Sequence, residues 1–169
     1  MSSLFTDPRL PPRTASLYIA VAAVGLLATA FLMEYGFGVA PCSLCLLQRW
    51  PHGAVIPLAA LAFLPAISDS GRRVLLLLCA AAFATTAGIG IYHVGVEEGI
   101  FAGPSACSGG ITGESIEELR RKLMAAPVIR CNEVAWSLFG ISLAGYNVLA
   151  SSALALFSAA ISTRGRLKT

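Results

Sequence analysis

Residues 74–92 read VLLLLCAAAFATTAGIGIY, a run of 19 positions without one charged side chain. A bilayer core about 30 Å thick is crossed by roughly 20 apolar residues in an α-helix, so this stretch has the length and composition of a membrane span. Residues 15–33 (ASLYIAVAAVGLLATAFLM) are a second uncharged run of 19, and residues 134–163 hold no charge across 30 positions. The sequence therefore predicts an all-α membrane protein.

The composition of the whole chain supports this interpretation. Of the 169 residues, 56% are hydrophobic and 12% are charged, and the mean hydropathy is +0.75. A soluble domain carries about 25% charged residues, so this chain has too little polar surface for water. It is also too apolar for a disordered chain. No Lys or Arg run alternates with aromatic residues, which argues against a nucleic-acid partner. We expect one membrane domain covering residues 1–169.

A less regular candidate span covers residues 46–67. It is apolar over most of its length, but Arg49 and His52 lie near its start and three prolines interrupt it. Prolines are tolerated in lipid where neighbouring helices satisfy the freed carbonyl groups. Without this span, residues 41–49 and Cys107 would lie on opposite sides of the membrane. We therefore predict a four-transmembrane-helix bundle, with spans at about 15–33, 46–67, 74–92 and 134–161.

The first span has an alternative interpretation as a signal peptide. Arginines precede it, and Ala28-Thr29-Ala30 resembles a cleavage site. An uncharged run of 19 residues is too long for the apolar region of a typical signal peptide, and further spans follow. We expect this first helix to be retained.

Positive charge is distributed unevenly between the two sides of such a bundle. Residues 1–14, 68–73 and 164–169 share one side and carry seven Lys or Arg against two Asp. The loops 34–45 and 93–133 share the other side and carry four Lys or Arg against seven Glu. Lys and Arg in short loops and tails favour the cytoplasmic side of a membrane. Both termini are therefore predicted to be cytoplasmic, with both loops outside.

The second loop, residues 93–133, is long enough to contain structure of its own. Ser115 and Glu118 have the spacing of a helix capping box. Pro127 ends the helical pattern, which has an apolar stripe of Ile116, Leu119, Leu123 and Met124. We expect a short interfacial helix that lies flat on the membrane or packs on other residues of the loop.

Four of the five cysteines lie in the two external loops. Cys42 and Cys45 form a C-x-x-C motif, and Cys107 and Cys131 are 24 positions apart in the second loop. Disulfides persist outside the cytoplasm, and a thiolate of one pair can attack the disulfide of another. This pattern predicts a relay of thiol–disulfide exchange, although a structural disulfide in the second loop is the alternative. Cys79 lies within an apolar run and is expected to be buried and inert.

The residues around the C-x-x-C motif favour redox chemistry. Arg49 follows Cys45 by four positions, so both side chains lie on one face of a helix. A guanidinium there would stabilise a thiolate or another anion, while the alternative is contact with lipid headgroups. A zinc site of four cysteines is a rival interpretation, but such sites usually have two closely spaced pairs, so no metal site is expected. No G-x-G-x-x-G motif for a dinucleotide is present.

The segment PCSLCLLQR, residues 41–49, resembles the P-C-x-L-C-x-x-Q-R signature of the bacterial disulfide bond formation protein B (DsbB) family. Other similar stretches are 92–97 (YHVGVE), Gly103-Pro104 ahead of Cys107, and 136–142 (WSLFGIS) after Cys131. The resemblance implies a thiol oxidase of the bacterial inner membrane. Such a protein would oxidise a periplasmic, DsbA-type dithiol protein of thioredoxin fold and pass the electrons to membrane quinone, either ubiquinone or menaquinone.

The resemblance also implies roles for the individual cysteines. Cys107 would be attacked by the partner's thiolate, and the released Cys131 would attack Cys42. Cys45 would then face the quinone as a thiolate, with Arg49 stabilising the developing negative charge.

His93 lies near a histidine that some family members place beside the quinone, although it could equally be a polar residue at the membrane interface. Glu97 is a further candidate with no assigned role. Two other functions stay open at this point. One is a quinone-coupled thiol oxidoreductase like vitamin K epoxide reductase, in which the C-x-x-C motif follows the loop pair instead of preceding it. The other is a non-enzymatic membrane protein with structural disulfides or a zinc site.

Overall fold

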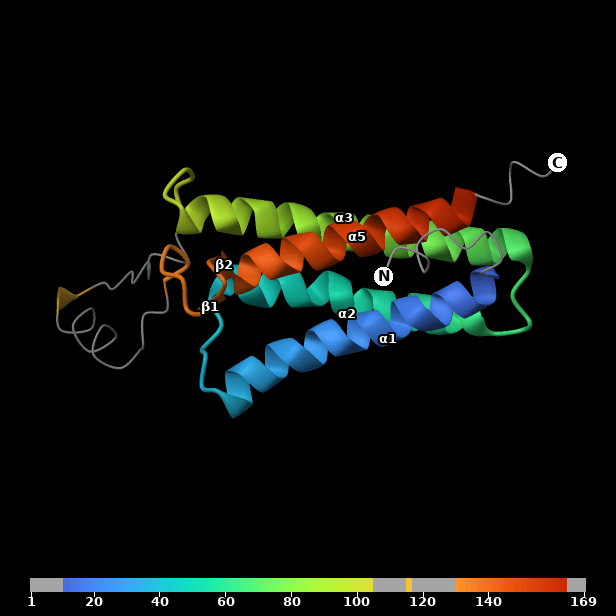
Figure 1. Cartoon of the computed structure of the whole chain (residues 1–169), viewed down its shortest axis with the longest axis horizontal. Helices are drawn as coiled ribbons and strands as arrows, with labels where there is room; N and C mark the ends of the chain where they lie inside the picture. The colour runs from blue at the N-terminus through green and yellow to red at the C-terminus, as the bar shows by residue number, and fades with distance from the viewer. Residues whose placement is uncertain (1–10, 105–114, 117–129, 164–169) are drawn as a thin grey trace.

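The computed structural model describes residues 11–104, 115–116 and 130–163 of the chain. Over these residues, four long helices lie side by side as one elongated bundle (Figure 1). They are α1 (Pro12–Phe31), α2 (Ser43–Phe63), α3 (Asp69–Glu97) and α5 (Leu143–Thr163). A π-helical turn, η1 (Leu32–Gly36), extends α1, and an antiparallel hairpin of β1 (Ser137–Leu138) and β2 (Ile141–Ser142) precedes α5.

Three helical segments are long and apolar enough to cross a membrane, namely Pro12–Gly36, Asp69–Glu97 and Leu143–Thr163. Their outer faces expose large apolar side chains, among them Val21 and Leu156, as lipid contact requires. The chain is therefore a predominantly helical, polytopic membrane protein. The fourth predicted crossing corresponds to α2, which packs against α1 and α3 but carries more polar residues.

The last helix begins later than the sequence predicted. The expected span started near residue 134, whereas α5 begins at Leu143. Residues 134–142 contain the hairpin instead, and its turn has positive φ angles at Phe139 (51°) and Gly140 (78°). Two consecutive residues with positive φ characterise a tight hairpin turn. Absence of charge predicts membrane proximity but does not distinguish a helix from an apolar hairpin, which explains the difference.

The bounds of α2 are also shifted, from the predicted 46–67 to Ser43–Phe63. The helix continues through Pro51 and Pro57, as expected for prolines packed among neighbouring helices. It ends at Leu64, whose extended backbone (ψ 138°) is the conformation that a following proline favours.

The predicted interfacial helix begins at Ser115 and Ile116, which the structure describes. The rest of that prediction lies outside the described residues, as does Cys107. Cys79 is fully buried among apolar side chains, including Phe83 and Leu76, which confirms its predicted burial.

The two ends of the bundle differ in what they carry (Figure 1). The start of α1, the α2–α3 turn and the end of α5 lie at one end. There, Arg13 Nε donates a hydrogen bond to the Phe63 carbonyl (3.0 Å), and its guanidinium lies 4.8 Å from the centroid of the Phe63 ring. The start of α2, the end of α3 and the hairpin lie at the opposite end, so Cys42, Cys45 and Cys131 gather away from the chain termini of the bundle.

Arg72 joins α2 to α3 at the end of the bundle that lacks the cysteines. Although it is charged, its side chain is almost fully buried. Nε donates to the Ala62 carbonyl (2.8 Å), while Nη2 donates to the carbonyls of Leu64 (3.3 Å) and Ile67 (3.0 Å). Nη1 pairs with Asp69 at 2.8 Å. These bonds satisfy carbonyl groups that the end of a helix leaves without partners.

Replacing Arg72 with alanine should lower the free energy of unfolding by about 2–3 kcal/mol, because buried carbonyls lose a charged donor. Thermal unfolding in detergent, followed by circular dichroism, measures this loss. Arg73→Ala is the matched control, since Arg73 is the adjacent and less buried arginine. Equal destabilisation by the two variants would contradict this role for Arg72.

Candidate functional site

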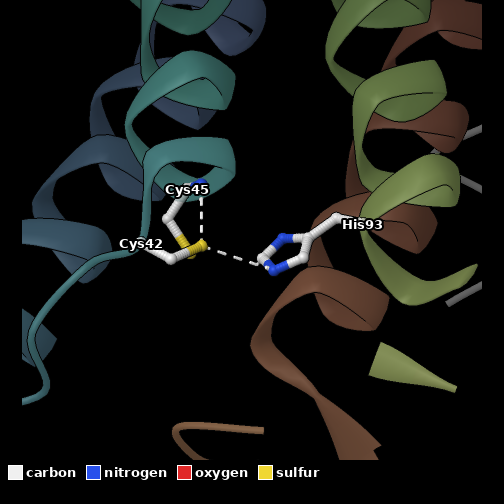
Figure 2. A group of neighbouring side chains, drawn as sticks. All are labelled: Cys42, Cys45 and His93. Atoms are coloured by element: carbon white, nitrogen blue, oxygen red, sulfur yellow. Dashed lines mark hydrogen bonds between the residues drawn. The ribbon is translucent and has the colours of Figure 1, made fainter. Parts of the chain in front are cut away.

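The C-x-x-C motif forms the start of α2. Cys42 is the residue that caps the helix, and Cys45 lies in its first turn. The backbone N–H of Cys45 donates to Cys42 Sγ (3.4 Å), and the two Sγ atoms are hydrogen-bonded at 3.3 Å (Figure 2). Both cysteines are free thiols, so the structure describes the reduced form of this pair.

His93 reaches this pair from the last turns of α3 (Figure 2). Its Nε2 lies 3.5 Å from Cys42 Sγ and 3.8 Å from Glu97 Oε1. Both side chains are almost fully buried, and Glu97 Oε2 accepts a hydrogen bond from Ser142 Oγ. The structure thus brings His93, a candidate from the sequence, directly beside the sulfur atoms.

Cys131 lies against the same motif although it is far away in the sequence. Its side chain is 1% exposed and packs with Cys42, Cys45 and neighbouring apolar residues. Cys131 Sγ lies 3.6 Å from the hydroxyl oxygen of Ser43, between the two cysteines of the motif. Cys131 is itself disulfide-bonded. The two cysteine-bearing segments are therefore in contact, as thiol–disulfide exchange between them requires.

The surroundings of Cys42 favour its thiolate form. The hydrogen bond with the Cys45 side chain contributes most to lowering the pKa of Cys42, and His93 and the Cys45 backbone N–H lower it further. Burial acts in the opposite direction but does not outweigh these donors, so the pKa lies well below that of an ordinary thiol. A position at a helix N-terminus stabilises a thiolate in the same way. In the reduced pair, these donors therefore favour the thiolate form of Cys42.

Arg49 lies on the same face of α2 as Cys45, as the spacing predicted. Its Nη1 pairs with Glu34 Oε2 at 2.5 Å, and its guanidinium lies 4.9 Å from the centroid of the Phe31 ring. Both charged side chains are largely buried. The sequence analysis counted Glu34 only as an external charge, because its pairing depends on how η1 turns back toward α2.

A cavity of about 450 Å³ opens beside the cysteine pair. Its polar lining residues include Cys42, Cys45, Gln48, Arg49, His93 and Glu97. The remaining lining is mostly apolar and comes from α1, from α5 and from the segment before α5, for example Leu26, Ala30, Met33, Trp136, Leu143 and Ala150. A concave, largely apolar site with few polar groups is typical of sites for small apolar molecules with a polar head.

Behind the cavity, Gln48 is the centre of a buried polar network. Its Nε2 lies 3.1 Å from His93 Nδ1, and its Oε1 accepts a hydrogen bond from Asn147 Nδ2 (2.7 Å). Its backbone carbonyl accepts from Thr86 Oγ1 (3.2 Å). Side chains from α2, α3 and α5 are joined in this way.

The network continues deeper into the bundle. Asn147 Oδ1 accepts from Ser151 Oγ (3.0 Å), which also lies 3.3 Å from His52 Nε2. His52 Nδ1 donates to the Gln48 carbonyl at 2.9 Å. The sequence analysis assigned no role to Asn147, Ser151 or Gln48. The available signal was the presence of polar residues inside apolar helices, which marks functional candidates.

Cys42, Cys45 and His93 also have the composition of a metal site, since their ligand atoms all lie within 4.8 Å of one another. A histidine that binds a metal through Nε2 usually donates its Nδ1 proton to a neighbouring acceptor. Here Nδ1 faces the amide nitrogen of Gln48, which is a donor. The arrangement therefore favours thiol chemistry over metal binding at this site.

The fold and the site define a helical membrane protein with a pair of free thiols, Cys42 and Cys45, next to the disulfide-bonded Cys131. The family model for disulfide bond formation protein DsbB matches residues 12–161, and this chain belongs to that family. It is 32% identical to disulfide bond formation protein B of Verminephrobacter eiseniae over 160 residues, which cover 91% of this chain and 88% of that protein. It is also 32% identical to the protein of that name from Marinobacter nauticus over 142 residues, covering 77% and 79% of the two chains.

A third relative, an uncharacterized protein of Rickettsia prowazekii, is 28% identical over 148 residues, covering 86% of this chain and 84% of that protein. No solved structure matches the chain. The resemblance to the DsbB family seen in the sequence is confirmed, and the chain is a disulfide bond formation protein of the membrane.

The lowered pKa of Cys42 predicts the pH dependence of its thiolate. Because the thiolate is the favoured form, its ultraviolet absorbance should persist at neutral pH and disappear only on acidification through the lowered pKa. An ordinary thiol would lose this absorbance already near its pKa of about 8.5. The titration is made on protein with a reduced C-x-x-C pair, and Cys42→Ser should abolish the low-pH step. A single step near the ordinary value would contradict the assignment.

Proposed function

We propose that this chain is a quinone-dependent thiol oxidase of the bacterial inner membrane that reoxidises a periplasmic, DsbA-type dithiol protein. The observation that carries the proposal is the contact of Cys131 with the C-x-x-C motif at the edge of a largely apolar cavity. A structural disulfide has no need of a reactive thiolate beside it. The family to which the chain belongs supports the same chemistry.

The exchange begins at a disulfide between Cys107 and Cys131, with Cys42 and Cys45 also oxidised. The partner's thiolate attacks Cys107 and breaks the bond to Cys131. Cys131 then attacks Cys42, which breaks the Cys42–Cys45 bond and leaves Cys45 as the thiolate.

The partner's second thiolate next attacks the mixed disulfide and releases Cys107. Cys107 then attacks Cys131, which breaks the Cys131–Cys42 bond, releases Cys42 as a thiolate and restores the loop disulfide. The partner has lost two electrons, which the C-x-x-C pair now holds. The disulfide-bonded Cys131 and the free thiols of Cys42 and Cys45 support this step of the proposal.

Membrane quinone, ubiquinone or menaquinone, fits the cavity as the electron acceptor. The volume of about 450 Å³ is in the range of small-molecule sites. The apolar lining would contact the ring, while Cys45, Arg49 and His93 would face its polar atoms. When bound, a quinone accepts two electrons and two protons, which returns the pair to the disulfide. Both chain termini are proposed to be cytoplasmic, with the cysteine end of the bundle in the periplasm.

Turnover tests the proposal directly. The purified protein, supplied with quinone and a reduced thioredoxin-fold dithiol protein, should consume quinone, which is followed by its absorbance. Cys42→Ser and Cys45→Ser should each abolish this activity, because either change removes the dithiol. Cys79→Ala is the matched control, since Cys79 is buried elsewhere in the bundle. Absence of quinone loss in the unchanged protein would favour a structural role for the cysteines.

Arg49→Ala separates quinone use from exchange with the partner. Loss of one charged hydrogen-bond donor should raise KM for quinone about tenfold, while the mixed disulfide at Cys107 still forms. Glu34→Gln is the companion variant, because it removes the partner of Arg49 but keeps the guanidinium. Its KM should change much less. Failure of Arg49→Ala to form the mixed disulfide, trapped with a partner protein whose second cysteine is replaced by serine, would overturn this role.

A further inference from the structure

We propose that Asn147, acting through Gln48, holds His93 in the tautomer that carries its proton on Nε2 and donates it to Cys42. Asn147 is a positioning residue in this proposal, since it contacts neither sulfur atom. The inference deepens the proposed function and rests on it for its purpose.

The direction is first determined at Thr86. A backbone carbonyl has no proton, so Thr86 Oγ1 must donate in its 3.2 Å contact with the Gln48 carbonyl. A threonine hydroxyl has a single proton, so Oγ1 must accept in its 3.2 Å contact with Asn147. The amide nitrogen of Asn147 therefore points toward Thr86, and the Thr86 backbone carbonyl also receives it at 3.4 Å.

The contact on the opposite side of the amide agrees with this orientation, since Oδ1 lies 3.0 Å from the Ser151 hydroxyl oxygen. The Nδ2 group is then the donor in the 2.7 Å hydrogen bond to Gln48 Oε1. Because a side-chain amide has one oxygen and one nitrogen, Gln48 must present its nitrogen at its other contact.

That other contact is with His93 Nδ1, 3.1 Å from Gln48 Nε2. An amide nitrogen only donates, so Nδ1 must offer its lone pair. A neutral imidazole then carries its proton on Nε2. This nitrogen lies 3.5 Å from Cys42 Sγ, and Figure 2 shows it directed at the sulfur. The series of hydrogen bonds from Thr86 to Cys42 therefore fixes which atom is the donor in each contact.

The surrounding charges agree with this tautomer. On α3, Glu97 Oε1 lies 3.8 Å from His93 Nε2 and also favours a proton there. On α2, Arg49 pairs with Glu34 of η1, and Cys45 Sγ is hydrogen-bonded to Cys42 Sγ at 3.3 Å. The opposite tautomer would place a lone pair against both a thiolate and a carboxylate. Gln48 and Thr86 are buried, so water does not readily replace a lost partner.

The test measures protonation in the reduced protein, without quinone or partner. Nitrogen NMR of histidine-labelled protein should show His93 with its proton on Nε2, the signal being assigned by its loss in His93→Gln. In Asn147→Leu, Gln48 loses its donor and can rotate its oxygen toward Nδ1. The Nε2-protonated population should then fall, and the acid dissociation constant of the Cys42 thiol should decrease about tenfold.

Ser151→Ala is the matched control. It removes a contact of the same asparagine but leaves the donors to Gln48 and Thr86, so His93 should keep its Nε2 proton. Gln48→Met is a second test variant that removes the donor to Nδ1 directly and should also lower the Nε2-protonated population. An unchanged tautomer and thiol titration in Asn147→Leu or in Gln48→Met would overturn the proposal. Neither the His93 tautomer nor the thiol titration depends on turnover, so these measurements test the proposal independently of the oxidase function.

Discussion

Polar groups inside an apolar bundle must satisfy one another, and this constraint organises the site. Lipid offers no hydrogen bonds, and an unsatisfied buried polar group costs about 1–3 kcal/mol. Gln48 satisfies this requirement with three contacts to other helices, through its amide nitrogen, its amide oxygen and its backbone carbonyl. Those contacts come from α3 and α5. The bonds that join the helices are thus the same bonds that position His93.

The constraint extends to the reactive pair. Cys42 caps α2, so its sulfur accepts a hydrogen bond from the backbone N–H of Cys45, and His93 approaches from α3. These donors compensate for burial and stabilise one thiolate in a place where an isolated charge would be unfavourable. Cys131 packs on the same sulfur atoms. The same contacts therefore stabilise the fold and favour the thiolate. At the edge of this group of residues, Arg49 and Glu34 form an ion pair with no net charge.

Several features were accessible from the sequence because they depend on local pattern. Uncharged runs predicted α1, α3 and most of α5, and the C-x-x-C motif with Arg49 indicated redox chemistry and the family. The hairpin before α5 was missed, because an apolar turn has the same composition as an apolar helix end. Arg72 was counted as a surface charge, yet it is buried at the end of α2, where long-range packing supplies its carbonyl partners.

By itself, the sequence indicated a helical membrane protein of the DsbB family and predicted that four of its five cysteines lie in two loops on one side of the bundle. Hydropathy, charge asymmetry and residue spacing are properties of nearby positions in the sequence, so they can be determined without the structure. The tertiary structure decided which groups meet: Cys131 against Ser43, His93 against Cys42, and Asn147 against Gln48. The last of these pairs lies 99 positions apart, and only the packing of α5 on α2 and α3 brings its donor and acceptor within reach.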